Sequence, residues 1–312
     1  MKNILVIKHG SLGDIVQING VLKDLRSSFA DHNILLLTSP LYQELMIKCP
    51  YINDIILDDR KLKWNPLNFL KLRKKLNSYK FSHVFDLQNS KRTEIYRKCI
   101  SKNSIWSSSR TILRENEKKN EFDKLEILER FRIQLERSNV DPAHTMRPDF
   151  SWAIDHNFSP MEIINKKYIT LLPFCSKHLA HKKWPFYNEL ISMIRKKNQN
   201  IGIVVAPGPG EIAEASKLDA QVILDGDRPT NFFQLSKILS DSLFVVSNDT
   251  GPAHIAAHLG CRGLGLFGSH TSYKKVSIKT DNFDAIESKN LANITVEQVF
   301  DKIQLQLQLE DI

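Results

Sequence analysis

The sequence lacks the features that mark membrane-spanning, secreted and disulfide-rich proteins. No apolar run approaches the length of about 20 residues that crosses a bilayer. The four cysteines are scattered without a C-x-x-C pair, so the sequence indicates neither a disulfide framework nor a zinc ribbon. Met1 leads within three residues into the strand-like run Ile4–Ile7, a start unlike a signal peptide. We therefore expect a cytoplasmic protein.

Common cofactor and metal motifs are also missing. The glycine turn at 9–14, HGSLGD, is neither G-x-G-x-x-G nor a Walker loop, so a dinucleotide enzyme or a P-loop ATPase has little support. His254 and His258 have the spacing of zinc ligands on a helix, but no Glu follows the first His as the zinc-protease pattern requires. We expect neither a cofactor nor a metal.

What the chain does contain is an ordinary globular composition with an excess of positive charge. Its 312 residues suit two domains, and 42% hydrophobic with 25% charged residues can build buried cores. The 44 Lys and Arg against 35 Asp and Glu give a net charge of +9. This excess favours acidic partners, which include nucleic acid, anionic lipid and phosphorylated substrates.

Short apolar strands alternate with amphipathic helices along nearly the whole chain, the pattern of an α/β protein with parallel sheets. The span 151–165 has no sustained period and is the expected linker between a domain at 1–150 and one at 166–312. Longer predicted helices include 121–138 and a docked C-terminal helix that opens with the capping box Thr295-x-x-Gln298. The predicted strands are 4–7, 33–38, 52–57, 83–87, 168–172, 201–205, 221–224, 243–246 and 263–267.

The segment 243–268 is the strongest candidate for a ligand site. A buried strand, Leu243–Val246, runs through a polar turn into a short helix that starts near Pro252 and ends at Gly260, which can take the left-handed conformation. Backbone N–H groups at such a helix start bind anions, and the carboxyl edge of a parallel sheet is where ligands bind. The simpler interpretation is that Asp249 and Thr250 only cap the helix.

Other candidate residues follow strands in the same way. Asp14 lies at the start of a predicted helix, where its carboxylate either takes part in catalysis or only interacts favourably with the helix dipole. Ser176 and Lys182 lie on a loop that either binds a diphosphate or is an exposed basic loop. Glu211 either holds a ribose hydroxyl or stabilises the first turn of a helix. Asp225-Gly226-Asp227 is better explained as a turn than as a D-x-D metal motif.

Taken together, these motifs resemble the ADP-heptose:lipopolysaccharide heptosyltransferases, glycosyltransferase family 9. The resemblance runs nearly end to end. It rests on GSLGD at 10–14, DLQNSKR at 86–92, KKWP at 182–185, PGE at 209–211, DTGPAH at 249–254 and LFG at 266–268. Gly20 departs from the family's usual proline, and the segment 269–271, SHT, departs from the usual P-T-D.

The resemblance implies a GT-B fold, in which two Rossmann-like parallel-sheet domains face each other across a cleft, with the acceptor on the N-terminal domain and the nucleotide-sugar donor on the C-terminal one. Asp14 then matches the proposed general base. The implied donor-binding residues are Ser176, Lys182, Glu211, Asp249, Thr250, Gly251 and His254. Ser176 lies two residues further from Lys182 than the family pattern expects. The family's transfer inverts the anomeric centre and uses no D-x-D metal.

The function so implied is an inverting glycosyltransferase that moves heptose from ADP-heptose to a lipopolysaccharide core. The acceptor is then an anionic glycolipid, reached by peripheral contact with the inner face of the plasma membrane through basic residues such as Arg73, Lys74, Lys75, Arg92 and Arg97. One alternative is a transferase of the same fold for another nucleotide-sugar or glycan. Another is a basic nucleic-acid-binding α/β protein, but the sequence contains no nucleic-acid-binding motif, and we expect no nucleic-acid partner.

Overall fold

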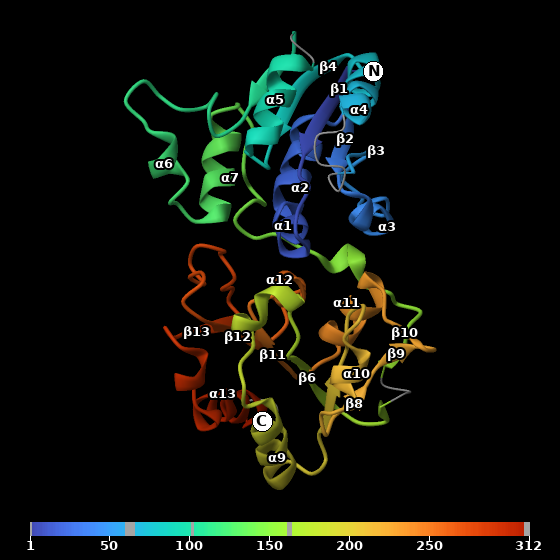
Figure 1. Ribbon diagram of the computed structural model, residues 1–312, viewed down its shortest axis with the longest axis vertical. Coiled ribbons are helices and arrows are strands. Elements are labelled where there is room, and N and C mark those ends of the chain that lie inside the picture. The colour runs from blue at the N-terminus through green and yellow to red at the C-terminus, as the bar shows by residue number, and fades with distance from the viewer. Residues whose placement is uncertain (1, 60–65, 101–102, 161–163, 309–312) are drawn as a thin grey trace. The chain divides into compact units, whose positions relative to one another are not determined.

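The computed structural model describes residues 2–59, 66–100, 103–160 and 164–308 (Figure 1). The chain divides into two compact units, Met1–Trp152 and Ala153–Ile312. Each unit is a parallel sheet with helices on both of its faces, as the strand and helix alternation predicts.

The sheet of the N-terminal unit has five parallel strands in the order β3-β2-β1-β4-β5. Its central strand β1 (Lys2–Ile7) is buried from Ile4 onward and pairs with a strand on each side. This central position places the turn after β1 at the middle of the sheet's carboxyl edge, where ligands bind in such folds. The other strands are β2 (His32–Thr38), β3 (Asp54–Leu57), β4 (Phe81–Asp86) and β5 (Ile105–Ser107).

Side chains of alternate strand residues cover opposite faces of this sheet. Leu5 and Ile7 of β1 pack with Leu72 and Leu76 of α4 (Pro66–Ser78) and with Tyr96 of α5 (Lys91–Cys99). The remaining helices of the unit are η1 (Pro40–Tyr42), α3 (Gln43–Met46), α1 (Leu12–Gln17), α2 (Asn19–Ser28), α6 (Lys119–Phe122) and α7 (Ile127–Glu136).

The sheet of the C-terminal unit has six parallel strands in the order β13-β12-β11-β6-β7-β8. Its strands are β6 (Tyr168–Leu172), β7 (Gly202–Val205), β8 (Gln221–Val222), β11 (Phe244–Asn248), β12 (Gly263–Phe267) and β13 (Phe283–Glu287). Strands β6, β7, β11 and β12 are buried along their whole length, which explains why they are continuous apolar runs in the sequence.

Two long helices cover one face of this sheet. Leu190 and Ile194 of α9 (Tyr187–Lys197) share a core with Ile303 of α13 (Val296–Gln308) and with the strands. The predicted capping box at the start of α13 is confirmed, since Thr295 N donates to Gln298 Oε1 (3.0 Å) and Gln298 N donates to Thr295 Oγ1 (3.3 Å). The other described helices are η3 (Lys177–Lys182), α10 (Ile212–Ala215), α11 (Phe232–Ser240), α12 (Gly251–His258) and η4 (Leu291–Asn293), while η2 (Ser151–Ala153) spans the boundary between the two units in the sequence.

Two predicted elements were wrong in extent. The helix expected at 121–138 is two helices, because Glu126 is extended (φ −57°, ψ 148°) and α7 begins only at Ile127. The strand expected at 221–224 leaves the sheet after Val222. Its last residue instead belongs to β9 (Leu224–Asp225), which forms a two-stranded hairpin with β10 (Arg228–Pro229). Helix α5 and the edge strands β5 and β13 were not predicted.

Gly20 is needed because another backbone segment lies against it. A β-carbon at this position would lie 2.3 Å from the carbonyl oxygen of His144. The segment at 144–145 is held there by buried Asp24, which accepts hydrogen bonds from His144 N (2.8 Å), Thr145 N (2.8 Å) and Thr145 Oγ1 (2.7 Å). This contact gives a physical reason for glycine where the family usually has proline.

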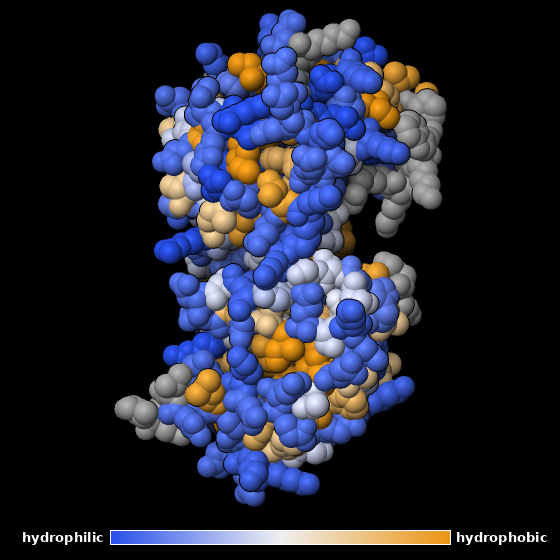
Figure 2. Space-filling view, turned by 90° about the vertical axis from the view of Figure 1, so that its left-hand side faces the viewer, coloured by the Kyte–Doolittle hydropathy of each residue, from blue (hydrophilic) through white to orange (hydrophobic). Residues whose placement is uncertain are grey.

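The helices of the described ranges include none that is long and apolar enough to cross a bilayer. On the face of the molecule shown in Figure 2, hydrophilic side chains predominate, and apolar ones form separate patches.

Candidate active site

Asp14 lies at the start of α1, directly after the central strand β1, and is bound on both of its oxygens. Lys8 Nζ lies 2.9 Å from Oδ1, while Ser11 N and Ser11 Oγ each donate to Oδ2 at 3.0 Å. Burial by itself would raise the pKa of Asp14, but the charge and hydrogen bond of Lys8 with the bonds from Ser11 more than offset this, and the pKa is lowered. The carboxylate is therefore ionised at neutral pH, and its side chain remains 37% exposed.

A second carboxylate, Asp58, lies at the same edge of the sheet and was missed by the sequence analysis. It follows β3 and is buried, and it is bound by His9 Nε2 (2.9 Å), by two nitrogens of Arg92 (2.6 and 3.0 Å) and by Tyr96 OH (2.5 Å). Burial would raise the pKa of Asp58, but the three hydrogen-bond donors hold it well below its usual range. The position of Asp58 after a strand was the signal that could have identified it.

The turn after β1 is fixed by the segment that follows β4. Gln88 Oε1 accepts hydrogen bonds from His9 N (3.0 Å) and Gly10 N (3.4 Å), and Lys8 Nζ donates to Leu87 O (3.4 Å). Gly10 has a positive φ of 75°, which favours glycine. The GSLGD and DLQNSKR motifs thus meet at one edge of the same sheet, although they begin 76 residues apart in the sequence.

In the C-terminal unit, the equivalent position after β11 holds Asp249, the first residue of DTGPAH. Its Oδ2 atom accepts from Lys182 Nζ (2.6 Å) and from His270 Nε2 (2.8 Å), and only 7% of the side chain is exposed. Burial would raise the pKa of Asp249, but Lys182 and His270 outweigh it and lower the pKa. His270 was not predicted to take part in this site.

Residues next to Lys182 explain why its loop reaches Asp249. Asn248, the last residue of β11, accepts from Trp184 N (3.0 Å) through Oδ1 and donates to Pro173 O (2.8 Å) through Nδ2. Trp184 is buried and donates from its indole nitrogen to Ile294 O (2.8 Å). The KKWP motif is therefore a packed anchor that holds the lysine loop at the end of the strand.

Thr250 and Gly251 begin helix α12, as predicted, and Gly260 after its end has a φ of +74°. The Thr250 side chain makes no capping hydrogen bond to the described N–H groups of α12, and its Oγ1 lies 3.3 Å from Ser247 Oγ instead. Because Asp249 pairs with Lys182 and His270, helix capping alone does not account for these residues. His254 lies one turn into α12 and is 5% exposed, with its ring centroid 6.1 Å from that of His258.

The remaining predicted donor residues lie on two loops of the C-terminal unit. Ser176 precedes η3 and is exposed. Glu211 precedes α10 and accepts from Gly208 N (2.7 Å) through Oε2, and burial raises its pKa.

The turn interpretation of 225–227 is confirmed, because Gly226 has a φ of +58° between β9 and β10. Among the residues that the structure describes, no group of three or more His, Cys, Asp or Glu is arranged to hold a metal.

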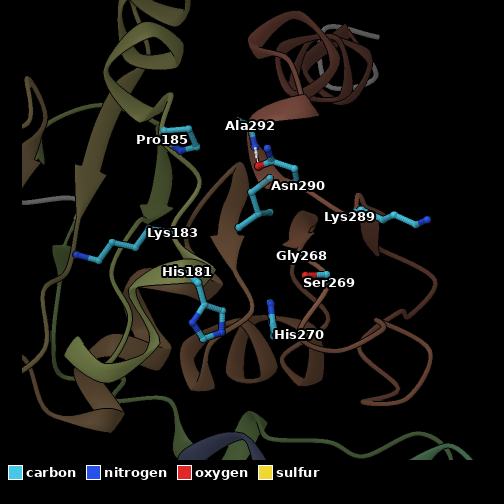
Figure 3. Close-up of a pocket in the computed structure, with 10 residues that line it drawn as sticks. His181, Lys183, Pro185, Gly268, Ser269, His270, Lys289, Asn290 and Ala292 are labelled. Carbon is cyan, nitrogen blue, oxygen red and sulfur yellow. Dashed lines mark hydrogen bonds between the residues drawn. The ribbon is translucent and has the colours of Figure 1, made fainter.

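A cavity of about 310 Å³ adjoins the Asp249 cluster (Figure 3). Its walls include His181, His270, Ser269, Asn290 and Leu291. The rings of His181 and His270 lie edge-to-face, with centroids 5.4 Å apart, whereas the labelled lysines at the rim extend away from the centre of the cavity. The two imidazoles, rather than the lysines, are therefore the charged or chargeable groups that face this space.

The model of glycosyltransferase family 9 (heptosyltransferase) matches residues 69–299, which is about three quarters of the chain. The chain belongs to glycosyltransferase family 9. It is an enzyme of the glycosyltransferase class, as the resemblance of its motifs implies. The match includes the lysine loop, the PGE turn and the DTGPAH block, while the GSLGD turn lies before it.

Three proteins similar to this chain are distant from it in sequence, and two of them have solved structures with a similar fold. The lipopolysaccharide core heptosyltransferase OpsX of Haemophilus influenzae is 23% identical over 305 residues, covering 93% of this chain and 86% of that protein. Escherichia coli heptosyltransferase WaaC with ADP matches with a TM-score of 0.74 at 16% identity, over 97% of this chain and 99% of that one. E. coli ADP-heptose lipopolysaccharide heptosyltransferase II matches with a TM-score of 0.72 at 16% identity, over the full length of both chains. The fold is thus the predicted GT-B type.

Proposed function

We propose that this family 9 enzyme transfers heptose from ADP-heptose to the core of a lipopolysaccharide, with inversion at the anomeric carbon. The observation that carries the proposal is the family match, together with a relative named as a lipopolysaccharide core heptosyltransferase and a structural neighbour that contains ADP. This reaction needs a base for the acceptor hydroxyl and a cation for the diphosphate. The ionised carboxylate of Asp14 supplies the base, and the Lys182 ammonium group beside Asp249 supplies the cation.

In the proposed reaction, an acceptor hydroxyl oxygen forms a bond to the anomeric carbon of the donor while the bond from that carbon to the diphosphate oxygen breaks. The hydroxyl proton passes to Asp14, which acts as the general base. The bonding electrons leave with ADP, whose negative charge is stabilised by Lys182 and by the backbone N–H groups at the start of α12. The proposed contacts of Ser176, Glu211, Thr250, Gly251 and His254 also belong to this donor site.

The donor can be identified by a thermal-shift screen of the purified protein against ADP-heptose, ADP-glucose, UDP-glucose, GDP-mannose and a single-stranded oligonucleotide. We expect ADP-heptose and ADP to raise the melting temperature most, because a ligand stabilises the folded state by about 2.7 kcal/mol at 100 times its Kd. A larger shift with a UDP- or GDP-sugar would assign another donor. A shift with the oligonucleotide alone would favour the nucleic-acid-binding alternative.

Helix α4 is the part of the N-terminal unit best suited to an anionic glycolipid surface. The side chains of Leu67 and Leu70 are 66% and 52% exposed. Leu70, Lys71 and Lys74 follow Leu67 by three, four and seven positions, so all four residues lie on one face of the helix. Exposed leucines beside lysines are typical of helices that lie on a membrane. By contrast, Arg92 and Arg97 are bound to Asp58 and Glu94, so they contribute less than was expected from the sequence.

We expect the protein to bind vesicles that contain acidic phospholipid more strongly than neutral vesicles at low salt. The double variant Lys71→Glu/Lys74→Glu should lose at least about one kcal/mol per lysine of this attraction. A matched control, Lys196→Glu/Lys197→Glu, makes the same charge change on exposed residues of α9 in the C-terminal unit and should have little effect. Equal recruitment to acidic and neutral vesicles, or equal losses in both variants, would show that α4 is not a membrane surface.

A further inference from the structure

Asp249 has two cationic or chargeable partners on the same oxygen, and only one of them belongs to the predicted donor site. Lys182 Nζ and His270 Nε2 lie 2.6 Å and 2.8 Å from Oδ2. The exposed fractions of the three side chains are 7% for Asp249, 11% for His270 and 18% for Lys182. The carboxylate is therefore the most deeply buried member and depends on both neighbours for its hydrogen bonds.

This arrangement creates a competition in the proposed reaction. The Lys182 ammonium group is paired with Asp249, and a diphosphate would draw the same group towards itself. A buried carboxylate that loses its only partner is strongly destabilised. The free energy lost at Asp249 when the nucleotide-sugar binds would then offset much of what the new lysine–phosphate contact contributes. This loss is avoided if a second hydrogen-bond donor stays on the carboxylate.

We propose that His270 is a positioning residue that holds the Asp249 carboxylate in place when Lys182 turns to the donor diphosphate. This assignment rests on the proposed function only for the identity of the ligand. The Nε2 nitrogen must carry a proton to donate to an ionised carboxylate. The ring lies edge-to-face against His181, and Gly268 leaves room for it, since an added β-carbon there would lie 3.2 Å from His270 Nδ1.

Lys183 cannot take over this role, because its ammonium group is bound elsewhere. Lys183 Nζ lies 2.6 Å and 2.8 Å from the two carboxylate oxygens of Glu214. Of the two groups that lie within hydrogen-bond distance of Asp249 Oδ2 in the described part of the chain, His270 is thus the one that can remain there when Lys182 leaves.

A double-mutant cycle on stability tests the assignment without any ligand. Lys182→Ala, His270→Phe and the double variant are unfolded with urea, and the shifts of the midpoints are compared. We expect the double variant to lose clearly more than the sum of the single losses, because only there is the buried carboxylate left without either donor. The same cycle in an Asp249→Asn background should be additive. A cycle of Lys183→Ala with His270→Phe should be additive as well, because the Lys183 ammonium group is bound to Glu214 and not to Asp249. Additive losses in the first cycle would overturn the proposal.

ADP binding measured by calorimetry supplies the functional part of the test. His270→Phe should raise the Kd for ADP about tenfold, the size of effect expected for one charge-assisted hydrogen bond. His270→Gln, which keeps an N–H donor, should restore most of the affinity. In turnover, the KM for the donor should rise more than kcat falls. Unchanged affinity in His270→Phe, or no rescue by glutamine in a folded variant, would contradict the assignment. If the parent protein binds no ADP, the proposed donor is wrong, and the stability cycle alone decides the role of His270.

Discussion

Asp14→Asn should lower the turnover number by about 10²–10⁴-fold while leaving ADP binding unchanged, because a positioned general base contributes about this much to proton transfer. The substituted amide keeps the size of the side chain and one carbonyl oxygen for Ser11, but it cannot accept the acceptor's proton. Donor affinity should be spared because the residues proposed to bind the donor all belong to the C-terminal unit. Single-turnover kinetics and calorimetry with ADP would measure the two quantities separately.

The control for this experiment is Ser11→Ala. Ser11 Oγ donates to the same oxygen of Asp14, so its removal weakens the turn at the start of α1 but leaves the carboxylate. Ser11→Ala should therefore lower turnover far less than Asp14→Asn. A parent-like rate in a folded Asp14→Asn variant, or equal losses in both variants, would leave Asp14 as a structural residue of the helix start.

The pH profile of the parent enzyme provides an independent check on Asp14. Its pKa is lowered from the ordinary value for the side chain, because the charge and hydrogen bonds of Lys8 and Ser11 outweigh the effect of burial. A lowered pKa keeps the base ionised as the pH falls, so kcat/KM should stay level between pH 8 and about pH 5 if Asp14 is the group that limits it. A steep loss of activity near neutral pH would point to a different base, with a higher pKa.

The sequence was sufficient to predict the parallel α/β fold, because the strands buried on both faces are unbroken apolar runs and each is followed by turn residues. The elements that were missed have weak patterns. Strand β5 has only three residues, β13 at the sheet edge alternates poorly, and α5 carries Lys, Arg and Glu over most of its length. Such segments become regular only through tertiary contacts, as when Tyr96 of α5 packs into the core.

The candidate residues could be located from the sequence, but their partners could not. Asp14 and Asp249 were predicted because each lies between a strand and a helix, a local pattern. The approach of Lys182 and His270 to Asp249 depends on the strand order β12-β11-β6, which brings together residues 67 and 21 positions away along the chain. Asp58 also follows a strand, but the donors that mark it as part of a site come from distant segments, His9 in the turn after β1 and Arg92 and Tyr96 of α5.

Lys182→Ala should weaken the binding of ADP and of the ADP-sugar by about one to three kcal/mol, or about fivefold to 150-fold in Kd. The reason is that a diphosphate needs a compensating cation beside the backbone dipoles of α12, and the KKWP anchor places this ammonium group at the end of β11. The variant should fold, since His270 still donates to Asp249. Lys183→Ala is the matched control, because it removes the adjacent lysine, whose ammonium group is bound to Glu214 instead. Calorimetry with ADP should show a large loss for the first variant and little for the second. If both variants bind ADP as the parent does, the cation that neutralises the diphosphate must lie elsewhere in the C-terminal unit.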